Sequence, residues 1–170
     1  MGSGAASLRS SRAPRRATAG VLLTLVGIAA IAGTLDIGDN LIFNALRGVT
    51  PAMVFRFIAS GVVGAPAALR LGAAGVALGV LVHYSIAFAW TGALYLASRR
   101  VRFLLDRPLL GGPSFGAGVY MVMTFIAVPL SRVPPLTAAI TLANRTNAVL
   151  ALLVCIGLTN ALLTRRWLPA

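Results

Sequence analysis

The stretch LGAAGVALGVLVHYSIAFAWTGALYLAS, residues 71–98, decides the fold of this chain. It contains no Arg, Lys, Asp or Glu, and His83 lies near its middle. A helix of about 20 apolar residues crosses the hydrocarbon core of a bilayer, so a stretch of this length predicts a transmembrane helix. The alternating pattern of a membrane-spanning strand does not occur in it. We therefore expect helical spans, because a helix satisfies its own backbone hydrogen bonds in lipid.

Three other uncharged stretches are long enough to cross a membrane, and each is bounded by Arg or Asp. These predicted spans are residues 17–35, 108–131 and 146–164. The composition agrees, because 58% of the residues are hydrophobic and only 11% are charged, with a mean hydropathy of +0.90. Soluble domains carry about a quarter charged residues, so this chain lacks the polar surface of a soluble protein.

The sequence thus predicts an all-α, polytopic membrane protein with four transmembrane helices in an antiparallel bundle. Residues 17–164 form its single transmembrane domain, between a basic tail at 1–16 and a C-terminal tail at 165–170. One alternative concerns the first span, where Ala30-Ile31-Ala32 resembles the cleavage site of a signal peptide. A cleaved chain would retain three spans.

Arginine supplies all fifteen basic residues and predicts the orientation of the chain. Ten arginines occupy the N-terminal tail, the connection between the second and third spans, and the C-terminal tail, namely Arg9, Arg12, Arg15, Arg16, Arg99, Arg100, Arg102, Arg107, Arg165 and Arg166. The remaining five are spread over the longer loops of the other side. Cytoplasmic loops are enriched in Arg and Lys, so we expect both termini in the cytoplasm. The absence of Lys, Glu and Gln favours a GC-rich bacterial genome, and hence a bacterial inner (plasma) membrane.

The net charge of +12 would suit a nucleic-acid partner, but the arginines form short clusters at the ends of apolar runs without interleaved aromatic residues. We therefore expect the lipid bilayer as partner, and no nucleic acid.

The connection at residues 36–70 is too long for a tight hairpin and is apolar. Thr50 and Pro51 are typical of a helix start, with Thr as the cap and Pro in the first turn. The uncharged segment from Phe57 to Leu69 is too short to cross a membrane. It predicts an interfacial or re-entrant helix over about residues 51–69, and the alternative is an apolar loop packed on the bundle. The segment from Val133 to Ala143 resembles it on a smaller scale.

Two rows of small residues at i, i+4 spacing predict where helices pack closely, because small residues mark helix contacts in membranes. The rows are Gly75 and Gly79, continued by His83, and Gly112 and Gly116, continued by Tyr120 and Thr124. We expect the two rows to pack together, with His83 hydrogen-bonded to Tyr120 or Thr124. An ionisable residue in mid-membrane indicates a ligand or proton site. The alternative is a neutral histidine that only links two helices.

A second polar cluster consists of Asp36, Asp39 and Asn40, which share one helical face at the outer end of the first span. One interpretation is a cation or ligand site at the mouth of the bundle. The other is that these residues end the helix and pair with Arg56 or Arg70.

The candidate chemistry is otherwise sparse. Cys155 and His83 are the only cysteine and the only histidine, so no metal-binding spacing exists and no metal site is predicted. The sequence has no catalytic triad, phosphate loop or nucleotide fingerprint, and we expect no cofactor and no enzymatic activity.

Four motifs resemble a family of small bacterial membrane proteins that is distantly similar to the YagU-type inner-membrane proteins. They are Leu81-Val82-His83-Tyr84-Ser85-Ile86-Ala87-Phe88, Ala93-Leu94-Tyr95-Leu96-Ala97-Ser98-Arg99-Arg100, Tyr120-Met121-Val122-Met123 and Val128-Pro129-Leu130-Ser131. The resemblance covers residues 78 to 135 and implies a helical inner-membrane protein without catalytic residues. The chain departs from the family pattern at Thr124, where Asn often follows the Met.

Two functions compete on this evidence. The first is a non-enzymatic structural or accessory membrane component, associating through glycine faces as a homo-oligomer or with a neighbouring membrane subunit. The second is a small oligomeric transporter or channel that uses His83 and Tyr120.

Overall fold

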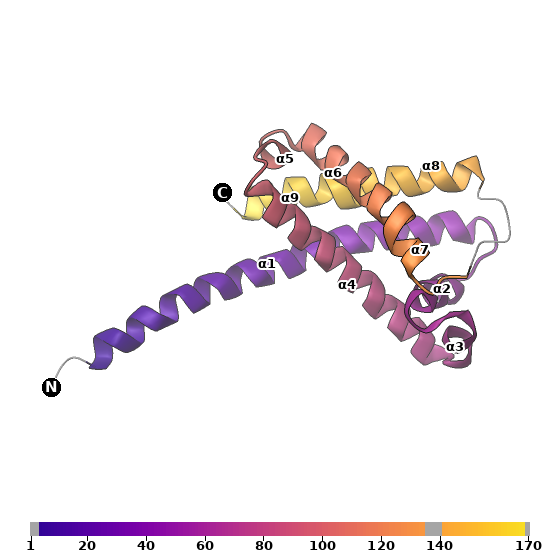
Figure 1. Ribbon diagram of the computed structural model, residues 1–170, viewed down its shortest axis with the longest axis horizontal. Helices are drawn as coiled ribbons and strands as arrows, with labels where there is room; N and C mark the ends of the chain where they lie inside the picture. The colour runs from indigo at the N-terminus through magenta and orange to yellow at the C-terminus, as the bar shows by residue number, and fades with distance from the viewer. Residues whose placement is uncertain (1–3, 135–140, 169–170) are drawn as a thin grey trace.

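The computed structural model describes residues 4–134 and 141–168, and the side chains from residue 18 onward within them. Helices make up the described chain, without strands (Figure 1). In chain order they are α1 (Gly4–Ala45), α2 (Pro51–Val63), α3 (Ala65–Arg70), α4 (Ala73–Ser98), α5 (Phe103–Asp106), α6 (Pro108–Val122), η1 (Met123–Ala127), α7 (Val128–Leu130), α8 (Leu142–Ala151), η2 (Leu152–Leu158) and α9 (Thr159–Trp167). The segments η1 and η2 are π-helical and continue the helices on either side of them.

Four helices of the described chain are long and apolar enough to cross a membrane. They are Thr18–Ala45, Ala73–Ser98, Pro108–Leu130 and Leu142–Trp167. The second and third agree with the predicted spans to within a few residues, and the fourth is longer at both ends. The chain is therefore an all-α polytopic membrane protein, as its composition predicts.

The first span is longer than predicted, because α1 continues to Ala45 rather than ending at Leu35. The interpretation that Asp36, Asp39 and Asn40 end the helix is wrong. A carboxylate does not break helical geometry, and both aspartates turn one side toward neighbouring helices, where they are half-buried. The helix ends instead after Ala45 in a turn that contains Gly48, whose φ is 77°.

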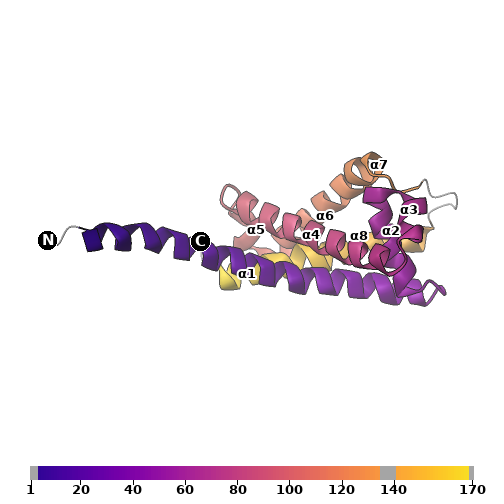
Figure 2. The ribbon, with the colours of Figure 1, turned by 90° about the horizontal axis from the view of Figure 1, so that it is seen from below.

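The order of the four spans in space differs from their order along the chain. α4 packs on α1, α1 also packs on the α8–η2–α9 helix, and that helix packs on α6. Figures 1 and 2 show this arrangement, with α4 crossing α1 at an angle and α6 tilted away above it. Each helix runs antiparallel to the one that follows it in the sequence.

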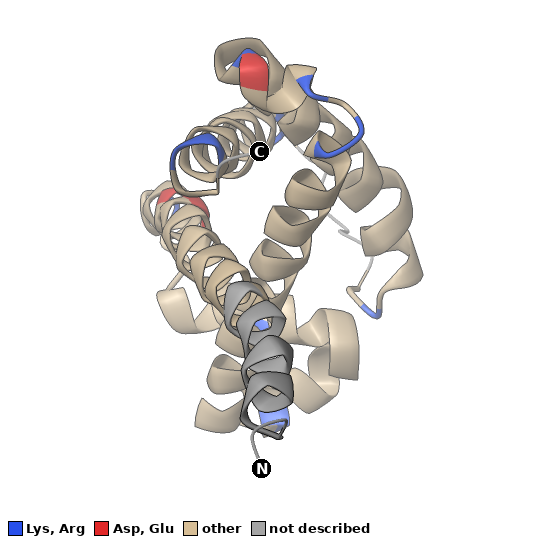
Figure 3. Ribbon diagram, turned by 90° about the vertical axis from the view of Figure 1, so that its left-hand side faces the viewer, with Lys and Arg blue, Asp and Glu red and all other residues tan. Residues whose placement is uncertain are grey.

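The N-terminus, the α5 connection and the C-terminus lie at the same end of the molecule, as the arginine pattern requires (Figure 1). Figure 3 looks at the bundle from that end and shows the arginine segments in loops and near the C-terminus, with long uncharged stretches between them. We refer to this end as the termini end, and to the end that carries α2 and α3 as the α2–α3 end.

The connection between the first two spans forms the short helices α2 and α3, so the alternative of an apolar loop is wrong. As predicted, Thr50 caps α2, and its side chain accepts a hydrogen bond from the backbone N of Met53, while Pro51 occupies the first turn. The two helices meet at Gly64, whose φ of 82° suits glycine. Both pack against α4. At 13 residues α2 is about 20 Å long, which is less than the hydrocarbon thickness. Residues 135–140 of the smaller apolar connection lie outside the described residues.

Candidate functional site

One face of α4 is buried along its whole length and carries His83. Its residues follow the predicted i, i+4 spacing and are Gly75, Gly79, His83, Ala87 and Thr91, followed by Leu94 and Ser98. The helical rise of ~1.5 Å per residue places His83 about 15 Å from Ala73, which is near the middle of the span. The row of small residues that contains His83 is therefore buried, as predicted.

The partner of His83 is on α1 and not on α6. The His83 Nε2 atom lies 2.8 Å from the carbonyl oxygen of Gly33, and only 8% of the side chain is exposed. The predicted hydrogen bond to Tyr120 or Thr124 is therefore wrong. Thr124 is exposed and Tyr120 is half-buried in α6. Gly33 permits the contact, because a Cβ atom there would lie 3.0 Å from the Cβ atom of Ala87.

The two glycine rows meet different helices, so the prediction that they pack on each other is wrong. Gly79 lies against the backbone of Phe55 in α2, and Gly75 lies against the carbonyl of Ala68 in α3. The physical reason is that α2 and α3 cover the glycine row of α4 and leave it inaccessible to α6.

The glycine row of α6 lies against η2. A Cβ atom at Gly112 would lie 2.8 Å from the Cα atom of Leu158, and one at Gly116 would lie 2.7 Å from the Cα atom of Leu153. Gly157 of η2 packs in turn on the carbonyl of Gly112. The third and fourth spans are therefore in backbone contact. All four glycines of the predicted rows contact other helices of the same chain.

A cavity of about 140 Å³ lies beside His83 and brings this residue together with Asp36. The two ionisable residues come from different helices, α1 and α4, and both line the cavity. The other lining residues are apolar and come from α4 itself and from three further segments, α2, η1 and η2, namely Ile58, Ile86, Ala87, Trp90, Met123, Leu152 and Ile156. Met123 belongs to η1, and Leu152 and Ile156 belong to η2, so both π-helical segments border the cavity. Such π-helical turns are frequent at functional sites.

The acidic cluster is divided by the fold. Asp36 lines the cavity, whereas the Oδ2 atom of Asp39 accepts a 2.8 Å hydrogen bond from Asn147 of α8. Asn40 is exposed and accepts a hydrogen bond from Asn44 of its own helix. The predicted partner Arg56 donates instead to the carbonyl of Gly72. Asp36 and Asp39 therefore face the bundle, and Asp36 belongs to the same site as His83.

A second polar contact lies deeper in the bundle, toward the termini end. Thr91 of α4 and Asn160 of α9 are completely buried, and the Oγ1 and Oδ1 atoms of the two side chains are 2.7 Å apart. The neighbouring Thr159 bonds the carbonyl of Val154 in its own helix. Thr91 was not among the predicted site residues, although it continues the i, i+4 row of Gly75, Gly79, His83 and Ala87.

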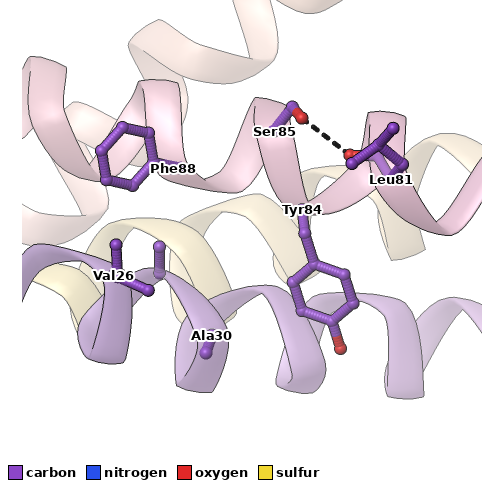
Figure 4. Close-up of a pocket in the computed structure, with 7 residues that line it drawn as sticks. Val26, Ala30, Leu81, Tyr84, Ser85 and Phe88 are labelled. Atoms are coloured by element: carbon purple, nitrogen blue, oxygen red, sulfur yellow. Dashed lines mark hydrogen bonds between the residues drawn. The ribbon is translucent and has the colours of Figure 1, made fainter. Parts of the chain in front are cut away.

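A larger groove of about 330 Å³ lies on the outside, between α1 and α4 (Figure 4). Val26 and Ala30 of α1 line it opposite Leu81, Tyr84 and Phe88 of α4, and Ser85 lies at its edge. Its polar groups are already bonded within the chain: the hydroxyl of Tyr84 lies 2.9 Å from that of Thr34, and Ser85 donates to the carbonyl of Leu81. The groove offers apolar contact only, and the inner cavity remains the candidate for chemistry.

The described residues contain no group of three His, Cys, Asp or Glu side chains that could hold a metal ion. Comparisons of the chain with protein-family models, with curated proteins and with solved structures give no match.

Proposed function

We propose that this chain is a non-enzymatic transport component of a bacterial inner membrane, which takes up and releases a proton at Asp36 and His83. We also propose that both termini are cytoplasmic, on the support of the arginine-rich segments that share the termini end. The observation that carries the proposal is the cavity lined by an aspartate and a histidine from two spans.

Placing an ionisable pair inside a membrane carries a free-energy cost when either side chain is charged. A charged aspartate near the bilayer centre costs roughly 2.5–3.5 kcal/mol, and ionisable residues within membrane spans face the bundle interior and mark ion or proton pathways. Imidazole changes its charge between about pH 5 and 8, and a neighbouring carboxylate can accept the same proton. The Asp36–His83 pair can therefore gain or lose one proton inside an apolar cavity.

A proton fits this site better than a metal cation. Calcium takes six to eight oxygen ligands and magnesium keeps an octahedral set, whereas the cavity offers one carboxylate among apolar walls. One of the two imidazole nitrogens is also engaged by the carbonyl of Gly33. The remaining donors and acceptors suffice for a proton and a few waters.

Purified protein in proteoliposomes tests the proposal. An imposed potassium diffusion potential should drive protons inward, and a pH-sensitive dye inside the vesicles should report acidification. We expect Asp36→Asn and His83→Gln to abolish this flux, and Thr24→Val, which alters a hydroxyl bonded to its own helix at Gly20, to preserve it. No flux above that of empty vesicles in the unaltered protein would overturn transport and leave the accessory role.

Site-specific spectroscopy can follow the proposed proton directly. His83 is the only histidine, so ¹⁵N-histidine labelling gives the signals of one imidazole. We expect Asp36→Asn to change these signals in nanodiscs, because the carboxylate of Asp36 lines the same cavity as the imidazole. Identical imidazole signals in the two proteins would make His83 a structural link between α1 and α4 only.

If the chain acts as an accessory component, it has to bind its partners through a surface other than the glycine rows. Because Gly75, Gly79, Gly112 and Gly116 contact α2, α3 and η2, they offer no free face to a second copy or a neighbouring subunit. Crosslinking in native membranes would measure the oligomeric state independently of transport.

A further inference from the structure

Another cavity, of about 190 Å³, lies at the α2–α3 end of the molecule. Its walls come from α2, from α3 and from the connection that follows α7. The polar residues that line it are Arg56 and Ser60, both on α2. The other lining residues are apolar, namely Met53, Phe57, Ala65, Ala68, Leu69 and Pro134. None of these residues lines the cavity beside His83, so the two cavities are separate sites.

Arg56 brings into this cavity a positive charge that no acidic residue balances. The chain has three acidic residues, Asp36, Asp39 and Asp106, and none of them lines the cavity. Within the described residues, the guanidinium makes one hydrogen bond, in which its Nε atom donates to the carbonyl of Gly72 at 3.3 Å. A guanidinium has five N–H donors, so the four at the two Nη atoms remain. Such donors bind phosphate through parallel hydrogen bonds.

The hydrogen bond to Gly72 also indicates the depth of Arg56 in the membrane. Gly72 directly precedes α4, and the whole of α4 is long and apolar enough to cross a membrane. The guanidinium therefore lies at the end of a span, at the level where the headgroups of the bilayer begin. Two apolar side chains of the same cavity, Phe57 and Leu69, are 45% and 62% exposed. A cation at headgroup level beside an open apolar wall suits an amphiphile with an anionic headgroup.

Further arginines near the cavity favour a ligand with a net negative charge. Arg70 is the last residue of α3, and its side chain is exposed. The backbone N of Arg132 donates a 2.9 Å hydrogen bond to the carbonyl of Gly61, which places this second exposed arginine next to α2. Arginines close to a membrane surface attract anionic lipids.

We propose that this cavity binds one anionic phospholipid of the surrounding bilayer, such as phosphatidylglycerol. The phosphate accepts hydrogen bonds from the Nη atoms of Arg56, and an acyl chain lies along Phe57 and Leu69. A cavity needs at least about 10–15 Å³ to hold one water, so about 190 Å³ provides space for a phosphate group. A free phosphate ion fits the site less well, because it would leave the apolar wall uncovered. The lipid site does not depend on the proposed proton transport.

Native mass spectrometry of the full chain in a neutral detergent, at about 0.15 M salt, tests the site. Dioleoylphosphatidylglycerol is titrated against dioleoylphosphatidylcholine, which has no net charge. We expect one phosphatidylglycerol per chain, bound at least about tenfold more tightly than phosphatidylcholine. Arg56→Gln should weaken this binding at least about tenfold. Arg70→Gln removes the same charge outside the cavity and should stay within about threefold of the unaltered protein, because salt screens an exposed charge.

Equal binding of the two lipids, or equal losses in Arg56→Gln and Arg70→Gln, would refute the site. Glycerol phosphate provides the soluble anion for comparison, and if it binds as tightly as phosphatidylglycerol, the occupant is not a lipid. Should Arg56→Gln fail to fold, Ala65→Leu decides, because it fills part of the cavity and keeps Arg56 in place. We expect Ala65→Leu to lose at least about tenfold in affinity, and unchanged binding would contradict a ligand inside the cavity.

Discussion

The contact between Gly79 and α2 makes a quantitative prediction about how the chain holds together. In Gly79→Ala the new methyl carbon would lie 2.5 Å from the carbonyl carbon and 2.9 Å from the Cα atom of Phe55, against ordinary contacts of 3.4–4 Å. The obstacle is backbone, so α2 has to move by roughly 1 Å, and a gap of that size forfeits a quarter to a half of each dispersion contact beside it. Overpacking of this kind costs about 1–3 kcal/mol.

Gly92 provides the matched control, because it lies on the same helix and a Cβ atom there would meet nothing within 4 Å. Gly92→Ala should stabilise α4 by about 0.5–1 kcal/mol, since alanine is the better helix former. We therefore expect the two variants to differ by about 2 kcal/mol in free energy of unfolding. Reversible unfolding in mixed detergent micelles, followed by circular dichroism, measures this difference. Equal stabilities would refute the close approach of α2 to α4.

Three further predictions concern single features. Thr50→Ala removes the cap of α2 and should cost about 1 kcal/mol, with faster amide exchange in α2; unchanged exchange would contradict the capping role. Gly64→Ala adds a Cβ atom at a backbone position with φ 82°, where no other atom lies within 4 Å, so the strain is in the backbone alone. The substitution should cost about 1–3 kcal/mol in unfolding titrations, and no loss would show that the α2–α3 turn can relax. Asn147→Leu removes the hydrogen bond to Asp39 and should cost about 1.5–3 kcal/mol, because that bond involves a carboxylate. A thermodynamic cycle with Asp39→Asn and the double variant measures the coupling energy between the two residues, and zero coupling would show that the bond does not stabilise the fold.

The prediction for His83 itself follows from its partner. The interhelical hydrogen bond to the carbonyl of Gly33 is worth roughly 0.6–2 kcal/mol, so His83→Leu should lower stability by no more than that. We expect unchanged protein levels together with lost flux. A collapsed protein level would indicate that the histidine is needed for packing.

The amino-acid sequence by itself determined the membrane class, the second and third spans, the cap of α2 and the burial of the row that contains His83. These features depend on properties local to each segment. The free energy of transferring a helix into lipid sums over its own residues, and the spacing of small residues defines one face whichever helix covers it.

Only the tertiary structure decided which helix covers each face. Lipid is as apolar as the side chains it surrounds, so no hydrophobic difference tells a glycine row which partner to choose. The choice depends on long-range packing, in which α2 and α3 occupy the glycine row of α4, and η2 occupies that of α6. For the same reason the spacing within single spans could not predict that His83 bonds Gly33, that Asp36 lines the same cavity, or that Thr91 lies against Asn160.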